Sequence, residues 1–156
     1  MRQLLLLCAL LACLLPSAAA GRTDHDVSVR EGPISHALRA LGTRYRYGGA
    51  SPETGFDCSG LIAHVFEQAG RTVPRTAREQ SRVGKAVKRA HLAPGDLVFY
   101  NTRNAPYSHV GMYVGNGRFV HAPRSGAKVR IERLDTHYWR TRFNGARRLD
   151  IDNSSH

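Results

Sequence analysis

The sequence predicts a single domain of the α+β class, with helices first along the chain and antiparallel strands after them. A helical pattern of apolar residues runs from Cys58 to Ala69, and short strand patterns separated by turn residues follow Gly84. No internal repeat divides the 156 residues, and a chain of this length can bury one real core. We place the domain at residues 33–149.

The first 20 residues predict a secretory signal peptide. A basic start precedes an uncharged run from Leu4 to Leu15 and a small-residue end, so cleavage would leave Gly21 first. The run is short for a membrane span. Leu-Leu-Ala-Cys ending at Cys13 faintly resembles a bacterial lipoprotein box, but the apolar residues beyond it favour plain cleavage. We therefore expect an exported protein of the periplasm or cell envelope, with residues 21–32 as a flexible lead-in.

Three helices are expected in the first half of the domain. Residues Pro33–Leu41 form an amphipathic pattern with proline at its start and glycine after its end. The second helix begins at Cys58, where Asp57 stands in the N-cap position and Gly70 stops the helix. The third is short and is capped near Arg75 or Thr76.

A glycine pair and a polar loop connect the first two helices. Gly48 and Gly49 predict a backbone conformation or a close approach that side chains would prevent. We expect residues 50–56 to form the loop, and they carry no strong strand pattern.

Strands are expected after Gly84. The clearest are Leu97–Tyr100, which follows a Pro-Gly-Asp turn, and Val110–Val114, which precedes the hairpin signal Asn116-Gly117. Residues 150–156 have the character of a frayed tail. Weaker strand patterns cover residues 85–87, 118–122, 129–131 and part of 138–149.

Cys58 is the only cysteine left once the predicted signal peptide is removed. Exported proteins usually pair their cysteines or lack them, so a single thiol suggests catalysis. The first turn of a helix also collects unpaired N–H groups and the positive end of the helix dipole, which favour a thiolate. The alternative is that Cys58 is a small buried hydrophobic residue.

A cysteine nucleophile needs a base, and the base needs a group that orients it. His109 and His121 stand at the outer ends of the predicted hairpin, so strand pairing would bring them together. His64 lies off the apolar stripe of its helix and should face solvent. The sequence contains no zinc motif and no Gly-x-Ser-x-Gly, and we expect neither a metal nor another cofactor. The other histidines lie in the ends of the chain or lack a partner pattern: His25, His36, His91, His137 and His156.

The chain carries a formal charge of +11 and a pI near 10.4. Basic residues do not alternate with aromatic ones as in a nucleic-acid site, so we expect no nucleic-acid partner. An exported basic protein suits an anionic cell wall or membrane surface. Charge alone favours the alternative of a solvated basic face that has no specific partner.

Several motifs occur together and in order along the chain. They are Tyr45-Arg46-Tyr47-Gly48-Gly49, Phe56-Asp57-Cys58-Ser59-Gly60-Leu61, Leu92-Ala93-Pro94-Gly95-Asp96-Leu97-Val98-Phe99, Ser108-His109-Val110-Gly111-Met112-Tyr113-Val114-Gly115 and Phe119-Val120-His121-Ala122. Together they resemble the NlpC/p60 family of bacterial cell-wall cysteine peptidases over Ile34 to Leu149. The resemblance implies a papain-like fold, in which the nucleophile helix packs against an antiparallel sheet.

The resemblance also implies roles for individual residues. Cys58 matches the nucleophile, His109 the general base that holds the thiolate as an ion pair, and His121 the polar residue that orients His109. Tyr45 matches a tyrosine close to the thiol, implicated in binding or in the oxyanion site. Asp57 and Ser59 match positions that shape the substrate cleft, and for Asp57 helix capping is at least as good an explanation.

The function implied is hydrolysis of peptide bonds in the stem peptides of peptidoglycan, by an enzyme that we expect to be a monomer. An amidase or acyltransferase of the same superfamily would keep the cysteine–histidine chemistry and change the acceptor. A non-catalytic wall-binding domain is the third alternative. All three expected catalytic residues are present in the chain, which favours an enzyme.

Overall fold

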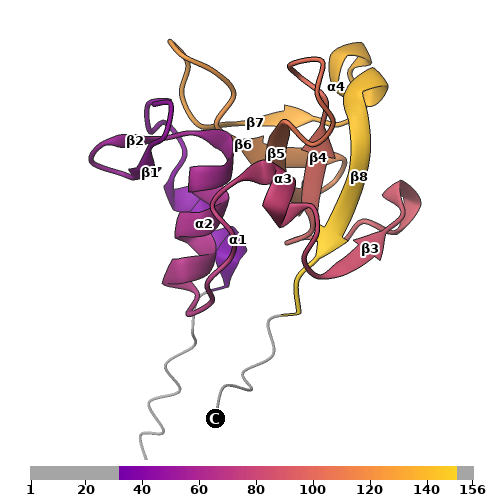
Figure 1. Ribbon diagram of the computed structural model, residues 1–156, viewed down its shortest axis with the longest axis horizontal. Coiled ribbons are helices and arrows are strands. Elements are labelled where there is room, and N and C mark those ends of the chain that lie inside the picture. The colour runs from indigo at the N-terminus through magenta and orange to yellow at the C-terminus, as the bar shows by residue number, and fades with distance from the viewer. Residues whose placement is uncertain (1–31, 151–156) are drawn as a thin grey trace, which may run out of the picture.

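The computed structural model describes residues 32–150 (Figure 1). The predicted signal peptide, nearly all of the lead-in and the tail after Asp150 lie outside the described residues. The helices are α1 (Pro33–Arg39), α2 (Cys58–Gln68), α3 (Ala77–Gln80) and α4 (His137–Arg142), with a 3-10 turn, η1, at Arg89–His91. The strands are β1 (Ala50–Ser51), β2 (Gly55–Phe56), β3 (Lys85–Val87), β4 (Leu97–Tyr100), β5 (His109–Gly115), β6 (Arg118–His121), β7 (Arg130–Arg133) and β8 (Phe143–Arg148).

Six strands form one antiparallel sheet in the order β3-β8-β4-β5-β6-β7. In Figure 1, α1 and α2 stand together on one side of this sheet, and α2 packs against both α1 and β5. The α+β class and the papain-like arrangement are therefore confirmed. Among residues 32–150, no helix has the length and apolar character needed to cross a bilayer.

Helix α2 owes its position to one apolar stripe. Leu61, Ile62, Val65 and Phe66 are almost completely buried and face β5 and α1. Each such burial contributes roughly 1.5–3 kcal/mol relative to exposure, so the stripe fixes the helix firmly on the sheet. The N-terminus of the helix, with Cys58, is thereby held at one edge of the core.

The sheet separates two hydrophobic clusters. One lies between the sheet and the helices α1 and α2 and includes Val110 and Met112 of β5. The other lies on the opposite face and is closed by Trp139 of α4, which packs with Tyr100 and Phe119. The alternation of side chains along β5 and β6 thus sends His109 and His121 towards the second cluster.

The hairpin between β5 and β6 turns at Asn116 and Gly117, as the sequence predicts. Both have positive φ angles, 52° and 67°, which is the conformation that a two-residue hairpin of this hand requires. The turn sets the pairing Met112–Val120, and from there His121 lies near the beginning of β5. A local turn signal therefore determines where the two histidines meet.

Three parts of the chain differ from the sequence-based expectation. The loop at residues 50–56 contains the short hairpin β1–β2, because Gly55 takes a φ of 102° and lets Phe56 pair with Ala50. A turn of 3-10 helix, η1, precedes β4 and was not expected. The helix α4 was not expected, and it occupies the first residues of the segment 138–149, within which the predicted last strand is β8.

Candidate active site

Cys58 is the first residue of α2 and lies half-buried in a cleft of about 510 Å³. The backbone N–H groups of Val110 and Ser59 interact with its thiol. Val110 directly follows His109, so the sulfur lies beside the start of β5. Residues that line the cleft include Tyr45, Tyr47, Asp57, Arg75, Arg103 and Tyr107.

Asp57 caps α2 and holds the loop that precedes it. Its Oδ1 accepts a hydrogen bond of 2.7 Å from the N–H of Gly60, and its Oδ2 accepts one of 2.9 Å from the N–H of Gly48. The guanidinium of Arg75 binds both oxygens, at 2.9 and 2.8 Å. The capping interpretation of Asp57 is thus confirmed, and contact with substrate stays a prediction.

The glycines at this point permit a close approach of two backbones. A Cβ atom on Gly60 would come within 2.0 Å of the carbonyl oxygen of Gly49, and one on Gly49 within 2.2 Å of that of Gly55. The Asp57 N–H also donates to the Gly49 carbonyl, at 3.0 Å. The loop of residues 45–49 is therefore packed tightly onto the beginning of α2, as the glycine pair predicts.

Ser59 is buried and its hydroxyl accepts a hydrogen bond of 3.1 Å from Arg75. It also donates to Asp57 at 3.4 Å. Ser59 and Asp57 thus belong to one network with Arg75, next to the thiol. This network neutralises the Asp57 carboxylate within the cleft wall.

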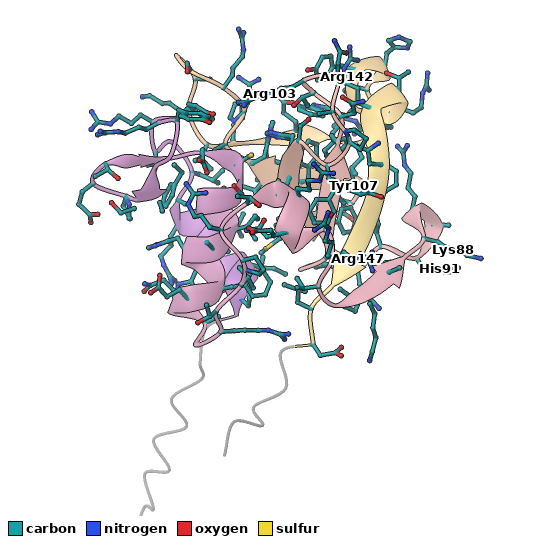
Figure 2. The ribbon with its side chains drawn as sticks, viewed as in Figure 1. Lys88, His91, Arg103, Tyr107, Arg142 and Arg147 are labelled. Carbon is teal, nitrogen blue, oxygen red and sulfur yellow. The ribbon has the colours of Figure 1, made fainter. Side chains whose placement is uncertain are left out.

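Tyr45 stands on the other side of Cys58. Burial raises the pKa of its hydroxyl, and the neighbouring Cys58 raises it further, whereas a hydrogen bond from Arg103 opposes these effects. Arg103 comes from the loop between β4 and β5 and also lies 5.8 Å from the centre of the Tyr47 ring. Figure 2 shows Arg103 near the top of the view, between the helices and the strands.

His109 and His121 are brought together as expected. His109 Nε2 and His121 Nδ1 are 2.8 Å apart, and both rings are buried. Gly111 makes this possible, because a Cβ atom there would lie 2.5 Å from the Phe119 ring and 3.2 Å from the His121 Cβ. The glycine two residues after His109 therefore leaves room for the two rings to meet.

Glu132 of β7 extends this pair into a chain of polar groups. Its Oε2 lies 3.4 Å from His121 Nε2 and accepts a hydrogen bond from the Trp139 indole, while Oε1 accepts one of 2.6 Å from Arg130. At 3.4 Å the contact with His121 is an electrostatic pairing and not a well-directed hydrogen bond. These contacts, that of His121 above all, lower the pKa of Glu132 to about 2.

The chain of contacts assigns the histidine tautomers. A carboxylate only accepts, so Glu132 favours a proton on His121 Nε2, which leaves His121 Nδ1 as an acceptor. His109 must then donate from Nε2. His109 Nδ1 is left with a free lone pair, and a nitrogen with a free lone pair is what a general base needs to accept a proton.

Burial dominates the ionisation of the thiol and the base. It raises the pKa of Cys58, against the N–H groups of Val110 and Ser59, and it lowers the pKa of His109 to about 3. Both groups are therefore neutral at pH 7 in the free site. Burial therefore opposes the expected thiolate–imidazolium ion pair, whereas the N–H groups at the helix start favour it.

The structure groups the predicted site residues in two sets. Tyr45, Asp57 and Ser59 surround Cys58, and His109 contacts His121. Among residues 32–150, no hydrogen bond joins the Cys58 sulfur to the His109 ring, and no group of acidic, histidine or cysteine side chains is arranged to hold a metal ion. The two sets meet where Val110 reaches the sulfur.

The remaining histidines take no part in this arrangement. His64 is half-buried against Phe56, with ring centres 5.1 Å apart, so the expectation that it faces solvent is wrong. His36 contacts Arg39, and His91 and His137 are exposed. His25 and His156 lie outside the described residues.

Four residues near the site were not found from the sequence: Arg75, Arg103, Glu132 and Trp139. Glu132 could have been found, because β7 pairs with β6 and extends two residues beyond the predicted strand end at Ile131. Trp139 is the only tryptophan of the chain, but no helix was expected at its position. Neither arginine stands in a local pattern that marks a site.

A cysteine at the start of a core helix, beside an antiparallel strand that carries a histidine pair, is the arrangement of the papain-like thiol hydrolase folds. Within that class, residues 42–148 match the NlpC/P60 family. The chain therefore belongs to the NlpC/P60 family, as the motif resemblance predicts.

Two curated relatives show what the chain is similar to. Murein DD-endopeptidase MepH of Escherichia coli K12 is 42% identical over 120 residues, which cover 74% of this chain and 44% of the relative. Gamma-DL-glutamyl hydrolase of Bacillus subtilis 168 is 42% identical over 134 residues, which cover 85% of this chain and 31% of that relative. The chain thus spans less than half the length of either relative.

The fold is also found in solved structures. An NlpC/P60 family protein from Bacillus cereus superposes with a TM-score of 0.70 at 38% identity, over 74% of this chain and 38% of that protein. This similarity supports the placement of the helices on the sheet.

Proposed function

We propose that this protein is a cysteine peptidase that hydrolyses peptide bonds in the stem peptides of bacterial peptidoglycan. The observation that carries the proposal is the position of Cys58, at the first residue of α2 in an open cleft and beside the strand that carries the His109–His121 pair. The names of the relatives, a murein endopeptidase and a glutamyl hydrolase, supply the substrate class.

In the proposed reaction, Cys58 Sγ bonds to the scissile carbonyl carbon while its proton passes to His109 Nδ1. The carbonyl electrons move to oxygen, and the backbone N–H of Cys58 and the Tyr45 hydroxyl are placed to stabilise that charge. The carbon–nitrogen bond then breaks, and the leaving nitrogen takes the proton from His109. A thioester on Cys58 remains.

Water completes the cycle. It attacks the thioester carbon and gives a proton to His109, and the carbon–sulfur bond breaks as Cys58 regains that proton. His121 keeps the His109 ring in the tautomer whose Nδ1 is free, and Glu132 fixes the tautomer of His121. No metal or organic cofactor is required by any of these steps.

The experiment that tests the proposal is mass spectrometry of purified muropeptides after digestion, beside a Cys58→Ala control. We expect the wild-type products to differ from the substrate by a defined stem fragment, which also identifies the bond, and the control to leave the substrate intact. Transfer of the acyl group to an added amine in place of water would indicate an acyltransferase instead. Retained hydrolysis in pure Cys58→Ala protein would refute the mechanism.

We further propose that residues 33–149 form the peptidase domain and that it acts in the cell envelope as a monomer. The family match over residues 42–148 supports the domain, and the cell-wall substrates named for the relatives support the location. The charge of +11 would assist contact with an anionic wall. If binding to isolated cell walls were insensitive to salt, this electrostatic contribution would be excluded.

A further inference from the structure

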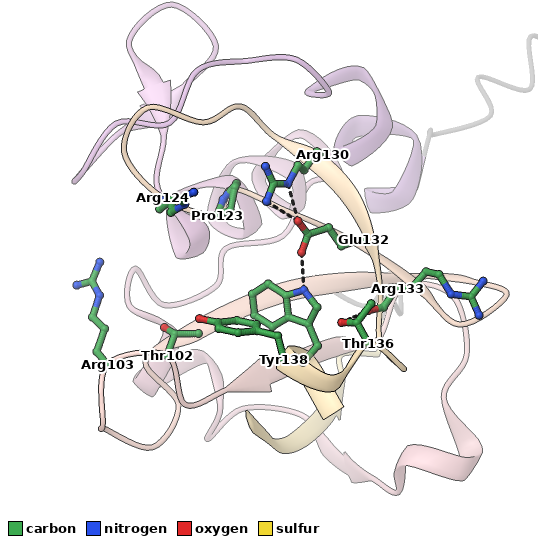
Figure 3. A pocket seen from close by; sticks show the side chains of 10 residues that line it. Thr102, Arg103, Pro123, Arg124, Arg130, Glu132, Arg133, Thr136 and Tyr138 are labelled. Carbon is green, nitrogen blue, oxygen red and sulfur yellow. Dashed lines mark hydrogen bonds and ion pairs between the residues drawn. The ribbon is translucent and has the colours of Figure 1, made fainter. Parts of the chain in front are cut away.

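A second cavity, larger than the cleft over Cys58, lies between β7 and α4. Its volume is about 800 Å³, the size of a pocket that holds a small molecule or a short peptide. We call it the arginine pocket, after its lining side chains Arg103, Arg124, Arg130 and Arg133, which stand around Tyr138 and Trp139. Figure 3 shows Arg124 and Arg130 on one side of the pocket and Tyr138 on the other.

The positive charges of this pocket are unequally compensated. Arg130 pairs with Glu132, and Arg133 pairs with Asp135 and points away from the aromatic rings in Figure 3. Within residues 32–150, no carboxylate lies within ion-pair distance of Arg103 or Arg124. The pocket therefore presents two guanidinium charges that no carboxylate neutralises, of which Arg103 also donates to the Tyr45 hydroxyl and lies over the Tyr47 ring.

The arginine pocket is connected to the proposed catalytic groups at two points. Arg103 lines both this pocket and the cleft over Cys58. Trp139, in the wall of the pocket, stacks on the His109 ring with centres 5.5 Å apart and planes inclined by 23°. A ligand in the pocket would thus contact Trp139, which stacks on His109, and would lie beside Arg103 at the border of the cleft over Cys58.

The position of the pocket relative to His109 also indicates which fragment of the substrate it would hold. His109 protonates the leaving amine in the proposed reaction, so the fragment that leaves must lie on the His109 side of the sulfur. The network of Asp57, Ser59 and Arg75 lines the cleft over Cys58 and does not reach the arginine pocket.

We infer that the arginine pocket binds a carboxylate of the leaving fragment of the stem peptide, with Arg124 and Arg103 as its ligands. The inference rests on the proposed function, and it adds the chemical group that determines which peptides are cleaved. A guanidinium matches a carboxylate in both charge and geometry, because it can offer two parallel N–H donors. Tyr138 and Trp139 would cover the apolar part of the same fragment.

The test uses the Cys58→Ala protein, so that binding is measured without turnover. The two ligands are a synthetic stem tetrapeptide with free α-carboxylates and the same tetrapeptide with those carboxylates amidated. Calorimetry gives the affinities, and the fluorescence of Trp139, the only tryptophan, reports whether the arginine pocket is occupied. We expect the free acid to bind about tenfold more tightly, a difference of about 1.4 kcal/mol, and to change the fluorescence.

A matched pair of variants assigns the effect to the pocket. Arg124→Gln in the Cys58→Ala background should abolish the preference for the acid. Arg118→Gln removes the same charge from the exposed start of β6, outside the pocket lining, and should leave the preference intact. Equal affinities for acid and amide, no binding of the acid, or an equal loss in both variants would overturn the inference.

The outcome is independent of the proposed hydrolysis. If the acid binds with the expected preference but the wild-type protein cleaves no stem peptide, the pocket assignment stands and the proposed function fails. If the wild type cleaves acid and amide with the same kcat/KM, the proposed function stands and the pocket assignment fails.

Discussion

The two halves of the candidate site are built in different ways. The Cys58 half is local, because Asp57, Cys58 and Ser59 are neighbours in sequence and the loop of residues 45–49 is tied to them by backbone contacts. The histidine half is assembled from β5, β6, β7 and α4, so its groups are brought together only by strand pairing and packing. The comparison shows that Cys58 is positioned by a capped helix start, whereas His109 is positioned by the sheet.

This difference predicts that the largest effect on activity comes from the first member of the histidine half. His109→Ala removes the base and should lower kcat/KM about 1,000-fold or more, since general-base catalysis contributes roughly 10²–10⁴-fold. His121→Asn should cost about tenfold, because an amide can still accept from His109 Nε2. Kinetics on stem peptides give kcat/KM for both variants and thus the ratio of the two losses.

Circular dichroism at matched concentrations controls for unfolding of either variant. A loss for His121→Asn as complete as that for His109→Ala would show that His121 does more than orient the base.

The next largest effect concerns the stability of the Cys58 half. Asp57→Ala removes the cap of α2 and leaves Arg75 without its partner, and should lower the free energy of unfolding by about 2 kcal/mol. Asp135→Ala is the matched control, because Asp135 also pairs with an arginine but lies at an exposed site. It should change stability by less than about 0.5 kcal/mol.

Urea denaturation of the two variants measures both values. Equal effects would mean that the Asp57 network contributes no more than a surface ion pair, and that the helix start is held by apolar packing alone.

The smallest expected effect is on how the stability of the fold depends on pH under acidic conditions. The pKa of Glu132 is lowered from 4.5 to about 2 in the folded protein, chiefly by His121. The ionised carboxylate therefore stabilises the fold above pH 4.5, and this stabilisation is lost as the pH falls towards 2. Glu132→Gln should reduce the slope of stability against pH in this interval.

Burial of neutral His109 acts in the same direction, since its pKa falls from 6.5 to about 3 and the unfolded chain binds the proton first. Thermal unfolding at pH 3, 4 and 6 measures the slope, with Glu67→Gln, at an exposed position on α2, as the control. An unchanged slope of stability against pH in Glu132→Gln would show that ionised Glu132 does not stabilise the fold through its contact with His121.

The same contrast explains how much could be predicted from sequence. The α+β class, α2 with its cap, the hairpin turn and the meeting of His109 with His121 follow from local patterns, namely the apolar stripe, Asp57, Asn116-Gly117 and strand alternation. These signals lie within a few residues of the structure that they determine. The predicted roles of the site residues in catalysis remain proposals.

Residues contributed by distant segments could not be predicted in this way. Arg75 reaches Asp57 across 18 residues, and Arg103 reaches Tyr45 from the β4–β5 loop. Trp139 belongs to α4, whose six residues are too short to show a helical period. The burial that raises the pKa of the Cys58 thiol also could not be predicted, because burial is a tertiary property that the helix N-terminus alone does not reveal.

The most direct test of the central claim, that Cys58 is the nucleophile, is stoichiometric alkylation followed by activity. Samples labelled to increasing extents with iodoacetamide are assayed on stem peptides, and peptide mapping gives the fraction of Cys58 modified in each. We predict that hydrolysis falls in proportion to the modified fraction and reaches zero when Cys58 is fully labelled. Hydrolysis that persists with Cys58 completely alkylated would contradict the account.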